Sequence, residues 1–412
     1  MTADWRTVQL KEVCKVVAGQ SPKGSSYNSN AKGLPFYQGK KEFSDKFVGE
    51  PTTWTTQITK EADAGDILMS VRAPVGPINF ATQRICIGRG LAAIRASNSI
   101  NKDYLFYALI YKQPEIRGNE GAVFASINKK QIENISLPLP EMDEQKRIVA
   151  ILDDAFAGID AAIANTEKNL ANARELFELC ASEVIFGDPE KRGWQRKHVF
   201  ELALPEKGAI RTGPFGSQLR HGEFVDSGVA VLGIDNAVNN RFMWGKKRYI
   251  SEEKYQQLKR YTVRPGDVLI TIMGTCGRCA IVPEDIPAAI NTKHLCCISL
   301  DRGLCIPEFL HAYFLYHPVA RRFLESRAKG SIMAGLNMGI IKDLPVWLPS
   351  LEEQKEIVER VGELGDETLR LRSVYEQKKL ALLELKQSFL QKAFSGELAV
   401  ENIEKELDEA VA

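Results

Sequence analysis

Cysteine residues come nearest, by their spacing, to forming a chemical site in this chain. The segment CGRC, residues 276–279, contains a C-x-x-C pair, and two further cysteines follow at Cys296 and Cys297. Four thiolates at such spacings can bind zinc, and a C-x-x-C pair alone can be redox active. Zinc binding and redox chemistry are therefore the first activities to weigh.

An internal repeat argues against both activities. In the repeat described below, Cys276 falls opposite Val75, while Cys296 and Cys297 fall opposite alanines in a predicted strand. Cysteine often serves as a small apolar core residue. Adjacent residues of a strand also point to opposite faces, which suits a single metal ion poorly. We therefore expect buried thiols and no metal site.

Other catalytic motifs do not occur in the sequence. The Asn/Asp-Pro-Pro-aromatic signature of amino-methyltransferases is missing, and so is a G-x-G-x-x-G loop. The segment GQSPKGSS, residues 19–26, has Ser25 where a phosphate-binding loop requires lysine. None of the five histidines is spaced as a zinc-ligand pair. The sequence predicts a non-catalytic chain with no cofactor of its own.

Composition places the chain among ordinary globular proteins. It has 412 residues, of which 44% are hydrophobic, enough for two domains or more. We find no apolar run long enough to span a bilayer and no signal peptide at the N-terminus. Eight cysteines in a chain of this length fit a reducing compartment. We expect a cytoplasmic protein that does not bind membranes.

Most of the chain is duplicated. The repeated pairs are ISLPLPEMDEQKRIVAIL (135–152) with LPVWLPSLEEQKEIVERV (344–361), AGDILMSVRAPVG (64–76) with PGDVLITIMGTCG (265–277), and GAVFASIN (121–128) with GSIMAGLN (330–337). The offset of about 200 residues is far too long for a solenoid and indicates two copies of one domain. The repeat also places Arg89 opposite Lys293.

Each copy ends in a predicted helix of about 45 residues, about 65 Å long. Apolar residues recur there at alternating spacings of four and three, which is typical of a coiled-coil seam. Pro140 and Pro349 precede the helices, Ser350 and Glu353 form a capping box, and glycines follow both helices. We predict that the two helices pair through Ile148, Leu152, Ile159, Ile163, Leu170, Phe177, Ile357, Val361, Leu364, Leu371, Leu382 and Phe389.

The segments before the helices read as mixed α and β structure. GDILMSV and GDVLITI are short strand patterns behind a Gly-Asp turn, helical patterns such as DYLFYALIYKQ follow, and glycine-rich loops lie between them. We therefore assign an α+β fold with two similar α/β domains and two long helices. The predicted boundaries are 1–140 and 189–349 for the domains, 141–188 and 350–396 for the helices, and 397–412 for a tail.

Charge separates the domains from the helices. Residues 1–140 hold 18 basic and 12 acidic residues, net +6, and residues 189–349 hold 23 and 15, net +8. The helical segment 141–188 has 4 and 11, net −7, and residues 350–412 have 9 and 15, net −6. The domains are thus suited to a polyanion and the helices are not.

The residues resemble a known family. LPEMDEQKRIV and LPSLEEQKEIV, the closing QKAFSGEL, the loop GPFGSQL and the duplicated order of domain and helix are similar to the DNA specificity subunit of type I restriction-modification systems. The resemblance covers essentially the whole chain, although no single motif is specific by itself.

The resemblance implies a division of labour. Each domain would be a target recognition domain for one half of a bipartite, asymmetric sequence in double-stranded DNA. The helices would form an antiparallel coiled coil that sets the spacer and docks two methyltransferase subunits, with the domains related by a pseudo-twofold axis. Restriction/translocase subunits would complete the complex. S-adenosylmethionine, ATP and Mg would bind to those partner subunits.

Candidate DNA contacts are polar or basic residues in predicted loops, since phosphates need cations and base edges need donors or acceptors. In the first domain we select Lys23, Ser25, Ser26, Tyr27, Lys40, Lys41 and Arg89. In the second we select Arg211, Ser217, Gln218, Arg220, Asn240, Arg241, Lys246, Lys247 and Lys293.

Two other functions remain open from the sequence. The chain could be the separate specificity subunit of a type IIB system, which only the domains of its partner would distinguish. It could also be a coiled-coil interaction protein whose basic domains bind something other than duplex DNA. A partner carrying the missing methyltransferase motif would separate the DNA-reading functions from the last one.

Overall fold

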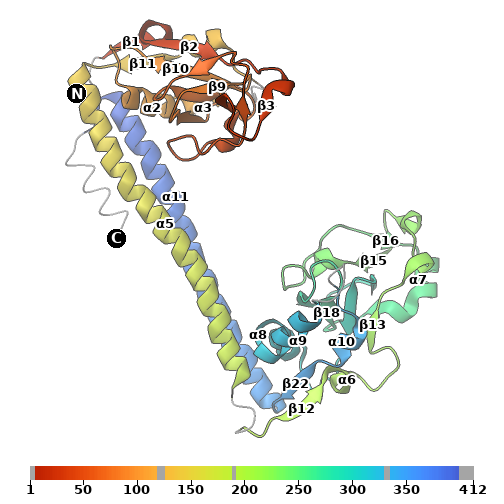
Figure 1. The fold of residues 1–412 in the computed structure, drawn as a ribbon. Helices are drawn as coiled ribbons and strands as arrows, with labels where there is room; N and C mark the ends of the chain where they lie inside the picture. The colour runs from red at the N-terminus through yellow and green to blue at the C-terminus, as the bar shows by residue number, and fades with distance from the viewer. Residues whose placement is uncertain (1–4, 118–125, 188–191, 329–334, 399–412) are drawn as a thin grey trace. The chain divides into compact units, whose positions relative to one another are not determined.

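The computed structural model describes residues 5–117, 126–187, 192–328 and 335–398. The chain forms two compact units (Figure 1). Unit 1 consists of Met1–Lys168 and Tyr375–Ala412, and unit 2 of Asn169–Val374. Each unit therefore contains one lobe of strands and short helices together with about half of each long helix, whereas the predicted boundaries separate lobes from helices. Within the described residues, no helix is both long and apolar enough to cross a membrane.

The first lobe is built from two sheets. Its strands are β1 (Arg6–Gln9), β2 (Cys14–Ala18), β3 (Tyr27–Asn28), β4 (Leu34–Tyr37), β5 (Trp54–Thr55), β6 (Glu61–Ala62), β7 (Ile67–Ser70), β8 (Ile78–Phe80), β9 (Ile85–Ile87), β10 (Leu91–Ala96) and β11 (Ser136–Leu139). An antiparallel sheet has the order β2-β10-β7-β8. The second sheet has the order β3-β5-β4-β9-β6, in which β4 and β9 run parallel.

Short helices and one further ladder complete the first lobe. The helices are α1 (Leu10–Val13), η1 (Gly24–Ser26), η2 (Lys40–Glu42), α2 (Lys102–Tyr111), α3 (Gln113–Arg117) and α4 (Lys129–Glu133). The ladder pairs β1 with β11 in an antiparallel register from Arg6↔Leu139 to Gln9↔Ser136. It brings the start of the lobe beside the strand that leads into the first long helix.

The second lobe repeats this plan. Its strands are β12 (Gln195–His198), β13 (Ile210–Thr212), β14 (Phe224–Val225), β15 (Val229–Leu232), β16 (Tyr249–Ile250), β17 (Thr262–Val263), β18 (Val268–Thr271), β19 (Cys279–Ile281), β20 (Ala289–Asn291), β21 (Leu295–Ile298) and β22 (Pro345–Leu348). Its helices are α6 (Val199–Leu202), η3 (Gly216–Gln218), η4 (His221–Glu223), η5 (Ile234–Asn236), α7 (Glu252–Leu258), η6 (Lys259–Tyr261), α8 (Pro307–Tyr316), α9 (Pro318–Ala328) and α10 (Met338–Lys342).

Strand order confirms the duplication. The sheets β13-β21-β18-β19 and β14-β16-β15-β20-β17 match those of the first lobe strand for strand, and β12–β22 repeats the β1–β11 ladder. The parallel pair recurs as β15 with β20. The predicted α+β fold with two similar mixed α/β domains is therefore confirmed.

The two long helices are α5 (Met142–Phe186) and α11 (Leu351–Ser395), and they run antiparallel. In unit 1, Lys386 Nζ lies 2.7 Å from Asp160 Oδ1 of α5, and Lys379 pairs with Glu167. From the first pair to the second, the position on α5 advances by seven residues while the position on α11 goes back by seven, as antiparallel helices require. In unit 2, Gly365 of α11 lies against the ring of Phe177 of α5. The predicted pairing of the helices is confirmed (Figure 1).

The predicted seam residues lie mostly between the helices or against a lobe. Ile163, Leu170, Phe177 and Leu364 are half-buried, and Leu371 is 42% exposed. The exposure of Leu371 is the exception among the predicted seam residues. The remaining predicted seam residues are buried: Ile148, Leu152, Ile159, Ile357, Val361, Leu382 and Phe389.

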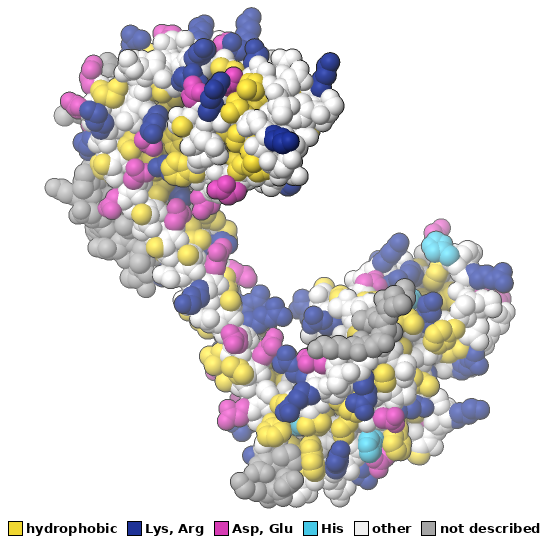
Figure 2. Space-filling model, viewed as in Figure 1, with side chains coloured by type: hydrophobic (Ala, Val, Ile, Leu, Met, Phe, Trp, Pro, Cys, Tyr) yellow, Lys and Arg dark blue, Asp and Glu magenta, His cyan; other side chains and the backbone are white. Residues whose placement is uncertain are grey.

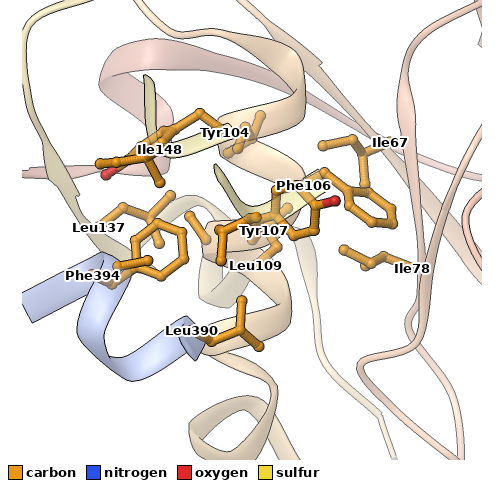
Figure 3. Close-up of a cluster of buried hydrophobic side chains, with 14 of the residues drawn as sticks. Ile67, Ile78, Tyr104, Phe106, Tyr107, Leu109, Leu137, Ile148, Leu390 and Phe394 are labelled. Carbon is orange, nitrogen blue, oxygen red and sulfur yellow. The ribbon is translucent and has the colours of Figure 1, made fainter. Parts of the chain in front are cut away.

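The core of unit 1 draws on both long helices. Figure 3 shows Leu390 and Phe394 of α11 beside Leu109 of α2, Leu137 of β11 and Ile148 of α5. The ring centroid of Phe394 is 5.2 Å from that of Tyr111 and 5.3 Å from that of Tyr104. Unit 2 repeats the arrangement with Ala181 and Ile185 of α5. Each lobe is therefore completed by the end of the helix that follows the other lobe in the sequence.

A Glu-Gln pair occurs in the first turn of both long helices, and its glutamine has a structural role. Gln145 is buried, and its side chain accepts a hydrogen bond from Asn101 N at 2.7 Å and donates one to Pro140 O at 2.9 Å. Gln354 does the same with Ile306 N and Pro349 O, both at 3.0 Å. Because a buried amide needs such partners, each glutamine fixes the first turn of a long helix to its own lobe. The predicted Ser350–Glu353 capping box is also present.

Candidate nucleic-acid interface

Four loops of the first lobe meet at one edge of its sheets. They follow β2, β4, β7 and β9, whose last residues all point toward this edge. Backbone hydrogen bonds join the loops, from Gly19 N to Leu91 O at 2.9 Å, from Gly88 N to Tyr37 O at 2.8 Å and from Val71 N to Gly90 O at 3.0 Å. We call residues 19–22, 38–42, 71–77 and 88–90 the first loop edge.

Polar side chains tie these loops together. Ser21 Oγ donates to Gln38 Oε1 at 3.0 Å and accepts from Arg89 N at 3.2 Å. The predicted contacts Lys40, Lys41 and Arg89 are exposed here. The first loop edge thus presents cations and an amide from three separate segments on a fixed backbone, as binding to nucleic acid requires.

The other predicted contacts of the first lobe form a separate group. Lys23, Ser25, Ser26 and Tyr27 lie farther along the same loop, at and before the outer strand β3. The Tyr27 ring stacks on Phe36 with centroids 4.8 Å apart, and its hydroxyl donates to Pro22 O at 3.1 Å. Lys23 and Ser25 are exposed, while Ser26 is half-buried.

The second lobe has a corresponding edge, whose loops are also joined by backbone hydrogen bonds. Gly213 N donates to Thr292 O at 3.3 Å, Thr292 N to Leu232 O at 2.8 Å and Ile272 N to His294 O at 2.9 Å. Lys293 therefore occupies the same turn as Arg89, as the repeat predicts. We call residues 213–218, 233–247, 272–278 and 292–294 the second loop edge.

Buried polar groups hold the longest loop of the second edge. Asn236 is buried, accepts a hydrogen bond from Gly233 N at 2.8 Å and donates one to Met243 O at 2.9 Å. Asp235 accepts from Lys246 N at 2.6 Å and pairs with Arg248. Burial acts to raise the pKa of Asp235, but the hydrogen bonds from Arg248 and Lys246 N outweigh it and keep that pKa below its usual value.

Two predicted contacts of the second edge have side chains that are partly engaged. Asn240 Oδ1 accepts from Cys279 N at 3.3 Å, so its amide supports the loop. Gln218 Oε1 accepts from Phe215 N at 3.2 Å and from the Tyr261 hydroxyl at 2.9 Å. Of the remaining predicted residues, Lys293 is half-buried, and the following are exposed: Ser217, Arg220, Arg241, Lys246 and Lys247.

Arg211 is not a surface residue, although the sequence favoured it as a DNA contact. It lies on β13, 8% exposed, with Nη2 2.6 Å from Asp267 Oδ2. Its Nη1 also donates to Ser299 Oγ at 2.9 Å. Because Asp267 is 3% exposed, the guanidinium is needed to neutralise a buried carboxylate. Its role is structural.

Sequence reasoning also missed residues at the edges. Arg72 and Met273 are exposed on the loops after β7 and β18, at equivalent positions. Trp244, 52% exposed, lies in the second loop edge. The alignment of AGDILMSVRAPVG with PGDVLITIMGTCG contained the signal for the first two, since it pairs Arg72 with Met273 inside a loop.

Five of the eight cysteines are buried in the core, and Cys14, Cys180 and Cys276 are half-buried. Cys296 packs in one apolar cluster and Cys297 in another, on opposite faces of β21, as predicted for adjacent strand residues. Burial raises the pKa of Cys296 and of Cys305 to about 12, so both remain thiols. In residues 5–117, 126–187, 192–328 and 335–398, no three His, Cys, Asp or Glu side chains come together as metal ligands would.

Figure 2 shows Lys and Arg side chains over the visible faces of both lobes, interspersed with apolar side chains. Such a mixed basic surface can bind the phosphate backbone while leaving other side chains free to contact bases. The geometry thus provides two equivalent loop edges with different side chains on the same scaffold.

Comparisons with known proteins agree with this geometry. The family model described as "Type I restriction modification DNA specificity domain" matches residues 2–171 and 221–381. The EcoBI specificity subunit of Escherichia coli is 25% identical over 417 residues, covering 96% of this chain and 87% of the relative. The putative MjaX specificity subunit of Methanocaldococcus jannaschii is 45% identical over 149 residues, 35% of each chain.

Solved structures share the fold. A chain in the structure "Structural basis underlying complex assembly and conformational transition of the type I R-M system" superposes with a TM-score of 0.75 at 18% identity, covering 97% of this chain and 100% of that one. The HsdS subunit from Thermoanaerobacter tengcongensis gives 0.55 at 19% identity, covering 96% and 97%. With the family model matched in both halves of the sequence, this chain belongs to the type I restriction-modification DNA specificity family.

Proposed function

We propose that this chain is the DNA-reading subunit of a type I restriction-modification complex and has no catalytic activity of its own. The observation that carries the proposal is the presence of two equivalent loop edges, one in each lobe, whose side chains differ. Equivalent scaffolds with different contact residues suit two half-sites of different sequence. Each lobe would read one half of an asymmetric bipartite site.

The long helices would space the lobes and bind the partner subunits. Several large apolar side chains are exposed on them, including Leu176 and Leu179 on α5 and Leu369, Leu380 and Leu383 on α11. Exposed apolar side chains that form a contiguous patch can mark interaction surfaces. We assign them to two methyltransferase subunits, joined by restriction/translocase subunits in the full complex. S-adenosylmethionine, ATP and Mg would bind to those subunits, and this chain would bind none of them.

The alternatives make different predictions about partners. A type IIB specificity subunit would copurify with a chain that carries methyltransferase and nuclease domains together. A coiled-coil protein unrelated to DNA would bring no methyltransferase at all. Affinity purification from the native host, followed by mass spectrometry, therefore tests the proposal: a separate methyltransferase carrying an Asn/Asp-Pro-Pro-aromatic motif supports it, and a complex without any methyltransferase contradicts it.

Binding to DNA should depend steeply on salt, and the first loop edge should contribute to that dependence. Each phosphate neutralised by a cation contributes a slope of about −0.9 in log K against log salt. For the double variant Lys40→Ala/Lys41→Ala in the reconstituted complex, we expect a slope shallower by about 1.8. Fluorescence anisotropy on a cognate duplex at several salt concentrations measures it.

Lys11→Ala provides the matched control. Lys11 is exposed on α1, just before the start of β2, whereas the first loop edge begins where β2 ends. Its loss should leave the slope unchanged. Equal effects of the control and of the double variant would show that the loop edge is not the contact surface.

A further inference from the structure

The two loop edges differ in the chemistry of one equivalent position. Arg72 follows Val71, whose N–H donates to Gly90 O, and Met273 follows Ile272, whose N–H donates to His294 O. Each residue also forms an isolated β-bridge. Arg72 pairs with Ser126, just before α4, and Met273 pairs with Gly335, just before α10. A guanidinium in one lobe is therefore replaced by a thioether in the other.

Apolar exposure extends over the second loop edge. Met273 is 38% exposed, Met243 37%, Trp244 52% and Phe215 51%. Of the described residues in the first loop edge, none is a large exposed apolar residue. Phe47 is exposed in the first lobe, but it lies away from the first loop edge. It forms a β-bridge with Phe80, at the end of β8 that is farthest from that edge.

The apolar side chains of the second edge are supported from below. Trp244 packs edge-on against Phe242, with ring centroids 5.3 Å apart and planes at 86°. Phe242 in turn packs on a core cluster of the lobe. Asn236, itself buried, binds the carbonyl of Met243. These contacts hold Met243 and Trp244 in place before any ligand binds. The two side chains therefore lose little conformational entropy on binding.

Basic residues flank this apolar group along the chain. Arg241 precedes Met243 and Trp244 in the loop, Lys246 and Lys247 follow them, and Lys293 occupies the neighbouring turn. Cations at these positions would contact phosphates. The apolar side chains between Arg241 and Lys246 would then be free to face the base edges.

We infer that the second lobe reads the 5-methyl groups of thymine in its half-site. The thymine methyl group is the apolar feature of the major groove, and a methionine or an aromatic face can contact it without leaving a polar group unpaired. Opposite a G·C pair, the same side chains would remove water from base donors and acceptors and return no hydrogen bond. This inference rests on the proposed function and specifies how one lobe performs it.

The first lobe supplies an internal comparison. Arg72, Arg89 and Gln38 present hydrogen-bonding groups at its edge. Arginine pairs with guanine and glutamine with adenine through atoms other than the thymine methyl. Removing thymine methyl groups from the half-site of the first lobe should therefore have a much smaller effect.

The test uses the complete methyltransferase complex and its mapped recognition duplex. Deoxyuridine replaces thymidine in one half-site at a time, which removes the methyl group and keeps every hydrogen bond. We expect one half-site to lose affinity by about fourfold per contacted methyl group, and the other to change by less than twofold. Equal responses of the two half-sites, or a half-site of the second lobe that contains no A·T pair, would overturn the inference.

Variants assign the effect to a lobe. Met273→Ala and Trp244→Ala should each reduce the preference for thymidine over deoxyuridine duplexes, whereas Phe200→Ala should keep the full preference. Phe200 is a suitable control because it is also exposed, at 51%, but lies on α6 outside the loop edge. A preference that stays at the wild-type level in both edge variants would overturn the inference. If the wild-type complex showed no specific binding to the recognition duplex, that result would instead contradict the proposed function.

Discussion

Replacing Arg211 with methionine is expected to lower the free energy of unfolding of unit 2 by about 3–5 kcal/mol, because it leaves a buried carboxylate without its cation. Asp267 is 3% exposed and accepts hydrogen bonds from Arg211 Nη2 at 2.6 Å and from Ser299 Oγ at 2.6 Å. Hydrogen exchange monitored by mass spectrometry measures the loss, since it resolves the amides of unit 2 from those of unit 1.

Matched variants make this result specific. Lys207→Met removes an exposed cation from the same lobe and should change stability by less than 0.5 kcal/mol, roughly as surface substitutions do. Adding Asp267→Asn to Arg211→Met removes the unpaired charge and should restore part of the loss. If Arg211→Met were as mild as Lys207→Met, the buried ion pair would not be a stabilising element of this lobe.

Replacing Ile159 with aspartate should separate the C-terminal half of α11 from α5 in unit 1. Ile159 is fully buried in the core cluster that also contains Leu382 and Phe389 of α11. The change removes a large apolar side chain and introduces a charge without a partner, so we expect a loss of about 4 kcal/mol or more. Recovery of the methyltransferase complex by affinity purification should fall sharply, while the sheets of the second lobe keep their exchange protection.

Ala161→Asp is the control for this substitution. Ala161 is exposed two residues farther along α5, so an aspartate there remains in water. Normal recovery of the complex with Ala161→Asp and loss with Ile159→Asp would support the seam as the assembly element. Unchanged recovery with Ile159→Asp would show that the helices need not pair for the complex to form.

The architecture could be predicted because the sequence contains repeated segments and regular spacings of apolar residues. The alternating four and three spacing of apolar residues gave both long helices, and the Ser350–Glu353 pair gave the start of one of them. Leu371 shows the limit of the pattern, since a residue at a seam spacing can still be exposed.

The candidate site was less predictable, because charge does not reveal burial. Arg211 looked like a surface cation in a loop, yet it neutralises Asp267. The first lobe neutralises the equivalent Asp66 from a different strand, with Arg95 of β10 at 2.6 Å. Only the strand pairing shows which arginine faces inward. The same pairing separates Lys23 and Tyr27 from the loop edge that holds Lys40 and Arg89.

The central claim is that two lobes read two half-sites whose separation the paired helices set. Removing one heptad from each helix, residues 169–175 and 370–376, preserves the seam and shortens each helix by about 10 Å, close to three base pairs of DNA. Mapping methylated bases in cells that carry the wild-type or the shortened chain tests the claim directly. We predict unchanged half-sites and a spacer shorter by about three base pairs. Altered half-sites, or the original spacer with full methylation, would contradict it.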